Sequence, residues 1–69
     1  MKVVYDAETD TLTIVFRDTL VQESDELRDG IIVDYDNEGH ACAIEILDAS
    51  EAVADPLNLS YELKARLPA

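Results

Sequence analysis

The chain has 69 residues, and its 16 acidic residues against five basic ones give a formal net charge of −11 at pH 7. A chain this short is expected to form one domain, residues 1–69, that buries only about 60% of the surface its unfolded form exposes. The charge argues against binding to DNA or RNA, because affinity for nucleic acids comes largely from Lys and Arg. Cys42 is the only cysteine, which excludes an internal disulfide and a cysteine-stapled secreted scaffold.

The N-terminal stretch MKVVYDAETD becomes acidic after two valines, which is too short an apolar run for a signal peptide. No later stretch approaches the length of a membrane-spanning segment. We therefore expect a soluble, cytoplasmic protein that does not bind membranes.

Two β-rich runs open the chain, KVVYD at 2–6 and TLTIVFR at 11–17, with AETD between them. Pairing Tyr5 with Leu12 and Val3 with Ile14 places all four side chains on one face, which predicts a β-hairpin. The next stretch, 22–28, is polar and ends at Asp29–Gly30, a frequent hairpin turn. It is interpreted as a short strand, and a helix capped by Ser24 is the alternative.

The runs IIVDYD and ACAIEIL flank a turn at NEG, and their hydrophobic pattern selects a register. If Val33 pairs with Ile44, one face carries only apolar side chains, whereas a slip of one residue would place Glu45 among them. The predicted apolar face is Ile31, Val33, Tyr35, Cys42, Ile44 and Ile46. The opposite face then carries Ile32, Ala41, Ala43 and Leu47 beside Asp34, Asp36 and Glu45.

A short helix is predicted near 49–54, with Asp48 and Glu51 at the spacing of a capping box and Asp55–Pro56 at its end. In 57–67 every second residue is apolar, which predicts a C-terminal strand, although the residue types there are also good helix formers. The predicted fold is therefore mainly β (α+β). It consists of antiparallel hairpins or a meander over 2–47, the short helix and the C-terminal strand.

The stretch DYDNEGHACAIE has the spacing of a calcium-binding EF-hand loop, with Asp34, Asp36, Glu38, Gly39 and Glu45 at the characteristic positions. An EF-hand loop lies between helices, however, and both flanks here are strand-like. In a hairpin Glu45 would lie about 16 Å along the strand from the turn, too far to close a cage with Glu38. We therefore predict an Asp-rich hairpin turn, no metal and no cofactor. Were a metal bound, its candidate ligands would be Asp34, Asp36, Glu38 and Glu45.

A set of residues within 2–50 forms a recognisable pattern: Tyr5 and Asp6, then Asp10, Leu12 and Ile14, then Gly30, Val33 to Asp36, Gly39, and Ile44 to Leu47 followed by Ala49 and Ser50. This pattern resembles the small prokaryotic domain-of-unknown-function family 2283, most specifically in the D-Y-D…G…I-E-I-L block. Ala7 and Ala43 depart from it, standing where Pro and Gly are frequent. The resemblance implies a short, often free-standing bacterial or archaeal protein without an established activity.

No arrangement of Ser, His and acidic residues predicts a catalytic site, so no catalytic residue is assigned. We predict a non-catalytic, acidic protein-interaction module that associates with itself as a dimer or larger homo-oligomer. A basic partner protein is a further prediction, because residues 1–55 hold fifteen acids and three bases. The alternatives are an antitoxin-like protein that neutralises a small basic toxin, and a hydrolase or metal-binding protein that uses Asp34, Asp36 and Glu45. The candidate interface residues are Ile32, Ala41, Ala43, Leu47, Leu59, Tyr61 and Leu63.

Overall fold

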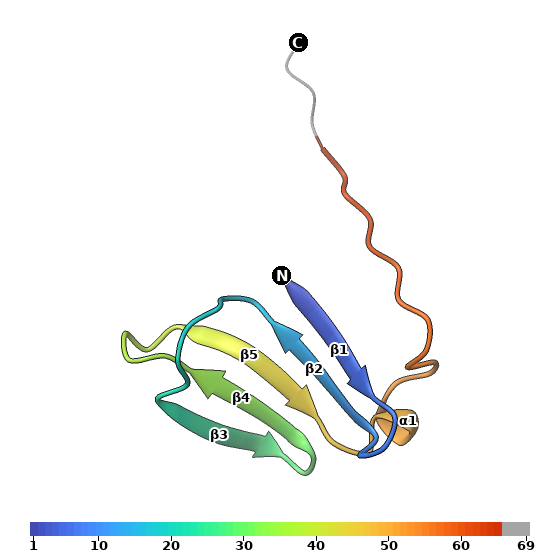
Figure 1. The fold of residues 1–69 in the computed structure, drawn as a ribbon, viewed down its shortest axis with the longest axis horizontal. Coiled ribbons are helices and arrows are strands. Elements are labelled where there is room, and N and C mark those ends of the chain that lie inside the picture. Colours follow the sequence, from blue (N-terminus) through green and yellow to red (C-terminus); the bar gives the residue numbers. More distant parts are fainter. Residues whose placement is uncertain (66–69) are drawn as a thin grey trace.

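The computed structural model describes residues 1–65 and contains one antiparallel sheet of five strands and one short helix (Figure 1). The strands are β1 (Lys2–Asp6), β2 (Thr11–Val15), β3 (Glu23–Arg28), β4 (Ile31–Tyr35) and β5 (Ala41–Ile46), and the helix is α1 (Ala49–Ala52). Their order across the sheet is β1-β2-β5-β4-β3. The predicted mainly β fold with one short helix is confirmed.

The predicted hairpin registers are also confirmed. Tyr5 pairs with Leu12 and Val3 with Ile14 in the first hairpin, and Val33 pairs with Ile44 between β4 and β5. Gly30, at φ 79°, completes the turn between β3 and β4, as the Asp29–Gly30 pair predicts. Residues 22–28 therefore contain a strand rather than a helix.

An irregularity at Cys42 changes the predicted register at one end of β5. The pairing passes from Asp34–Ala43 to Tyr35–Ala41, so Ala41 rather than Cys42 lies opposite Tyr35. Cys42 is the extra residue of a β-bulge. It is 1% exposed, and its Sγ lies 3.4 Å from the carbonyl oxygen of Asp34.

The connection from β2 to β3 passes the end of β5 and β4, because two strands lie between those it joins. The N–H groups of Phe16 and Arg17 donate to the carbonyl of Cys42, and that of Gln22 donates to the carbonyl of Tyr35. These bonds attach the connection to the bulged end of the sheet. The return of β5 beside β2 then joins the β1–β2 hairpin to the β3–β4–β5 meander.

The sheet is a single layer, since within residues 1–65 no second sheet lies on either face and α1 lies beyond the strand ends (Figure 1). Its buried apolar residues are correspondingly few, namely Val33, Cys42, Ala43 and Ala49. Alternation along the strands and the observed pairings place one set of apolar side chains on a common face. We call this set the open apolar face: Val3, Tyr5, Leu12, Ile14, Ile31, Val33, Tyr35, Ile44 and Ile46.

The helix differs from its prediction in length and in capping. It ends at Ala52 rather than at residue 54, and Asp48, at φ 49°, makes no side-chain capping bond, so the predicted capping box is wrong. The left-handed backbone of Asp48 differs from the extended backbone of an ordinary N-cap residue. Asp10 performs the capping from the β1–β2 turn, where its carboxylate accepts from Ser50 N and its carbonyl from Ala49 N.

The predicted C-terminal strand is not formed over residues 57–65, and residues 66 and 67 of that prediction lie outside the described residues. The segment has the alternation of a strand, but it forms no ladder with any strand in residues 1–65 (Figure 1). Its start is held by short-range bonds from Leu57 N to Asp55 Oδ1 and from Asn58 N to the Asp55 carbonyl. We call residues 57–65 the C-terminal arm.

Candidate functional site

The open apolar face consists of two cross-strand rows. Val3, Ile14, Ile44 and Val33 form one row, and Tyr5, Leu12, Ile46 and Ile31 form the other. Val33 is 7% exposed, whereas the other seven side chains are only half-buried. The rows end on β3 at Asp25, opposite Val33, and at Arg28, opposite Ile31. The apolar surface is therefore four strands wide, and its margin on β3 is charged.

Charged side chains are segregated to the other side of these four strands. None of the residues of the open apolar face is charged, although 16 of the 69 residues are acidic. The second face carries Lys2, Asp6, Asp34 and Glu45 at alternate positions. A surface without charge in so acidic a chain can be removed from water without desolvating an ion.

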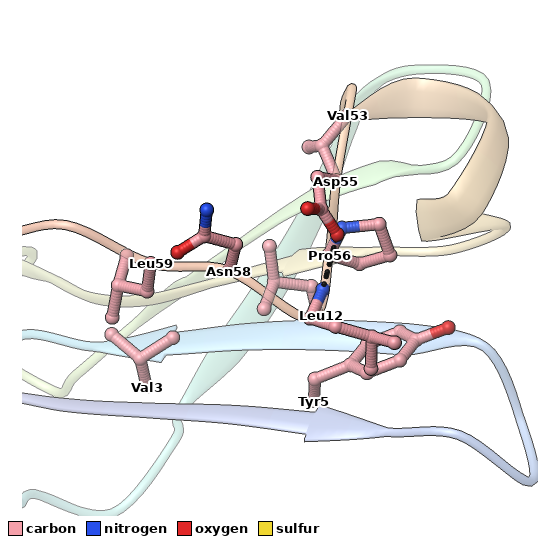
Figure 2. Close-up of a pocket in the computed structure, with 9 residues that line it drawn as sticks. Val3, Tyr5, Leu12, Val53, Asp55, Pro56, Asn58 and Leu59 are labelled. Atoms are coloured by element: carbon pink, nitrogen blue, oxygen red, sulfur yellow. Dashed lines mark hydrogen bonds between the residues drawn. The ribbon is translucent and has the colours of Figure 1, made fainter.

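The segment Val53–Leu59 lies over one margin of the open apolar face (Figure 2). Together with Val3, Tyr5 and Leu12 it encloses a groove of about 300 Å³, so this segment does not pack closely on the sheet. Further along, Leu59 and Tyr61 flank Met1 and Val3. Beyond this margin, the parts of the face on β5 and β4 have no covering element among the described residues.

The second face brings Asp34 and Glu45 together. Asp34 is 5% exposed and accepts a 2.6 Å hydrogen bond from Ser24 Oγ. The pKa of Glu45 is raised, chiefly because its carboxyl shares a hydrogen bond with Asp34 and further because it is partly desolvated and close to the Asp34 charge. The pair can hold a proton. It has no histidine beside it, because His40, the only one in the chain, belongs to the β4–β5 turn.

The other two predicted metal ligands lie apart from this pair, in the β4–β5 turn. Asp36 Oδ1 accepts from Glu38 N and His40 N, both at 2.9 Å, and these bonds hold the pKa of Asp36 below its usual value. The Glu38 side chain is 71% exposed and lies 3.5 Å from His40 Nδ1. Within residues 1–65 no three His, Cys, Asp or Glu side chains are grouped to hold a metal ion. The residues with EF-hand spacing therefore do not surround one site. Asp36 accepts hydrogen bonds within its own turn and Glu38 is exposed. Asp34 and Glu45 form a separate pair on the second face.

A third polar cluster was not predicted. Asp10 Oδ1 accepts from Tyr5 Oη at 2.7 Å and from Ser50 N at 2.9 Å, while Asp10 Oδ2 accepts from Ser50 Oγ at 2.6 Å. The hydrogen bonds from Ser50 and Tyr5 lower the pKa of Asp10. All three residues belong to the pattern that carries the family resemblance. The family pattern was therefore the signal from which this cluster could have been predicted. The structure shows that the cluster attaches α1 to the first hairpin.

The predicted interface residues lie in two places. On the second face, Ala43 is 6% exposed, Ile32 is half-buried, and both lie beside Asp34 and Glu45. Leu47, at the end of β5, is 39% exposed, and Ala41 is exposed at the turn end of that strand. On the C-terminal arm, Leu59, Tyr61 and Leu63 are 69%, 77% and 74% exposed. The arm therefore has far more apolar surface to bury than the second face has.

A family model described as "Protein of unknown function (DUF2283)" matches residues 2–50. This match includes all five strands and the first residues of α1. No curated protein and no solved structure matches the chain. No helix among the described residues has the length and apolar character needed to cross a membrane.

Proposed function

Because this chain belongs to DUF2283, a family of proteins of unknown function, we propose its role from its own geometry: it is a self-associating, acidic protein-interaction module. In this proposal two copies pack their open apolar faces together. The result is a two-layer β-sandwich, the usual way for a sheet with one apolar face to exclude water. The observation that carries the proposal is a four-strand-wide uncharged face whose parts on β5 and β4 are covered by nothing in residues 1–65.

Surface area supports this proposal. The accessible surface of the chain is 5804 Å². A compact monomer of 7.7 kDa has about 4300 Å². The excess, about 1500 Å², is larger than the roughly 800 Å² that each partner buries in a stable interface. Association of two copies therefore gives the sheet the second layer that the single chain lacks.

Net charge opposes association, because each copy carries −11. The position of the charges reduces this penalty, since Asp34, Glu45 and Asp6 project from the second face and point away from the proposed interface. On the interface side the acids lie at the margins of the face, on β3 and at Asp55 beside the groove. Repulsion then acts mostly through water, where salt screens it.

A dimer of this kind presents its second faces and its β3 strands to the surroundings. All six residues of β3 are exposed, and Glu23, Asp25 and Glu26 are acidic. Such a surface attracts basic proteins over a long range and repels nucleic acids. The module's further partner is therefore proposed to be a basic protein.

Sedimentation equilibrium tests self-association directly, with one matched pair of variants. Ile44→Lys introduces a charge into the open apolar face, and Ile32→Lys introduces the same charge into the second face; both residues are half-buried. We expect the unaltered chain and Ile32→Lys to be dimeric and Ile44→Lys to be monomeric. Circular dichroism of each variant is the control for folding, and only a folded variant is compared.

Two results would contradict the proposal. One is an unaltered chain that remains monomeric at 100 µM or so, a concentration far above the dissociation constants of specific dimers. The other is the reversed response, in which only Ile32→Lys dissociates the dimer. That response would place the interface on the second face, where Ile32, Ala41, Ala43 and Leu47 were predicted to form it.

A further inference from the structure

The C-terminal arm has the properties of a strand without a partner. Its apolar residues alternate with polar ones, and Leu57, Leu59, Tyr61 and Leu63 are all at least 69% exposed. Residues 59–65 have no assigned secondary structure. An extended segment with unpaired backbone groups and one apolar side is suited to join the edge of a sheet.

The arm starts on the same side of the sheet as the open apolar face. Leu57 and Leu59 line the groove with Val3, Tyr5 and Leu12, all of which belong to that face. In Figure 2 the chain passes from Pro56 to Leu59 in the direction opposite to β1, which runs from Val3 to Tyr5. The start of the arm, residues 57–59, therefore lies over β1 on the side that a second copy would occupy, and it runs antiparallel to β1.

Which strand of the second copy would lie near the arm depends on the direction of the two-fold axis, and one direction brings an exposed edge beside the arm. A two-fold axis between the layers and parallel to the strands reverses the strand order, so the β3 edge of the second copy comes to the β1 side of the first. Four antiparallel pairings separate β1 from β3, so these two strands run in the same direction. The arm is thus antiparallel to β3 of the second copy, as an antiparallel sheet requires.

Charge is complementary between the two segments. The outer edge of β3 has no neighbouring strand among residues 1–65, and its side chains include the carboxylates of Glu23, Asp25 and Glu26. The arm carries Lys64, one of only two lysines in the chain. The Lys64 side chain is 88% exposed, and its contact with Glu62, at 4.0 Å, is at the limit of an ion pair. The side chain is free to reach a carboxylate on another chain.

We propose that the C-terminal arm of each copy adds to the β3 edge of the other as a sixth strand. Leu59, Tyr61 and Leu63 then face the interior side, where Glu23 and Asp25 form the margin on β3. Lys64 faces the outer side and meets the carboxylate of Glu26, which lies opposite Ile32 on the second face. The two reciprocal arms cover the two exposed β3 edges, which would otherwise invite further association. This inference rests on the proposed self-association and specifies how the dimer is closed.

Zero-length cross-linking of the full chain tests the exchange. Equal amounts of ¹⁴N- and ¹⁵N-labelled chain are unfolded together, refolded and treated with a carbodiimide, which couples lysine amines to carboxylates. We expect Lys64 to couple to Glu26, the acid on the outer face of β3, with about half of the coupled peptide pairs of mixed isotope, as random pairing of chains in a dimer gives. Coupling of Lys64 to β3 only within single-isotope pairs, or only to carboxylates outside β3, would overturn the exchange.

A second measurement tests the backbone pairing. An edge strand bonds to its one neighbour through alternate residues, so of Tyr61 and Glu62 only one directs its N–H toward β3. Each is changed to Pro and, as its control, to Ala. At one of the two positions, the dimer dissociation constant of the Pro variant should be about tenfold higher than that of the Ala variant. The reason is that each of the two arms loses one hydrogen bond.

The outcomes separate this inference from the proposed function. A dimer in which Pro and Ala are equivalent at both positions overturns strand exchange and leaves face-to-face association intact. A chain that is monomeric in the same sedimentation measurement overturns both.

Discussion

Ser50 Oγ donates a 2.6 Å hydrogen bond to Asp10 Oδ2 across a separation of 40 residues. With the bonds from Tyr5 and Ser50 N to Asp10 Oδ1, it joins the first hairpin to the start of α1. Because Val53 directly follows α1, this attachment of the helix also determines where the C-terminal arm begins.

The Asp10 cluster should contribute measurably to stability. Asp10 and Asp48 both have positive φ, 53° and 49°, but only Asp10 makes side-chain capping bonds to the helix. Changing each to Gly removes a carboxylate without backbone strain. We expect Asp10→Gly to lower the melting temperature by about 5 °C or more and Asp48→Gly to leave it nearly unchanged. Equal losses in thermal denaturation would show that the hydrogen bonds of Asp10 contribute little.

Stability should pass through a maximum in mild acid. The pKa of Glu45 is raised above its ordinary 4.5, so its contribution is full below that value and is lost as pH rises through the raised pKa. The pKa values of Asp10 and Asp36 are lowered from 3.8, so their contributions are present above that value and are lost as pH falls further. The melting temperature should therefore rise as pH falls from 7 toward 4.5 and should fall as pH drops below 3.8.

Glu45→Gln is the control for this pH dependence, because it keeps the shape of the side chain and removes its titration. The rise as pH falls from 7 toward 4.5 should become smaller, while the fall below 3.8 persists. If the melting temperature of Glu45→Gln rises as much as that of the unaltered chain, the rise is caused by general repulsion among the acidic residues and not by Glu45.

Calcium should bind weakly if at all. The Asp36 carboxylate is engaged by two backbone N–H groups of its own turn, and Glu45 is paired with Asp34 on the second face. Titration calorimetry of metal-free protein should detect no site tighter than roughly 10⁻⁴ M. A stoichiometric micromolar site that disappears in Glu45→Gln would contradict the observed turn geometry.

Salt should strengthen the proposed dimer. Each copy carries −11, and the proposed interface is mostly apolar, so screening reduces a repulsion without weakening the main attraction. The dissociation constant from sedimentation should fall between about 20 mM and 500 mM NaCl, over which the screening length shortens several-fold. Weaker association at high salt would mean that ion pairs such as those of Lys64 dominate the interface.

The strands and most of their pairings were determined by the sequence itself. Apolar residues at every second position specify which side chains share a face, and a slip of one residue would exchange the two faces. Val33 therefore pairs with Ile44, and Gly30 supplies the positive φ that its hairpin turn needs. These features depend on residues close in the chain, so the local pattern is sufficient to predict them.

Only the tertiary structure decided which distant groups meet. Asp10 replaces Asp48 as the helix cap because the β1–β2 turn lies at the start of α1, and no local spacing encodes that proximity. The bulge at Cys42 likewise changes the partner of Tyr35, although the apolar alternation continues through it. The C-terminal arm has the pattern of a strand and forms none over 57–65, since a strand exists only where another backbone lies beside it.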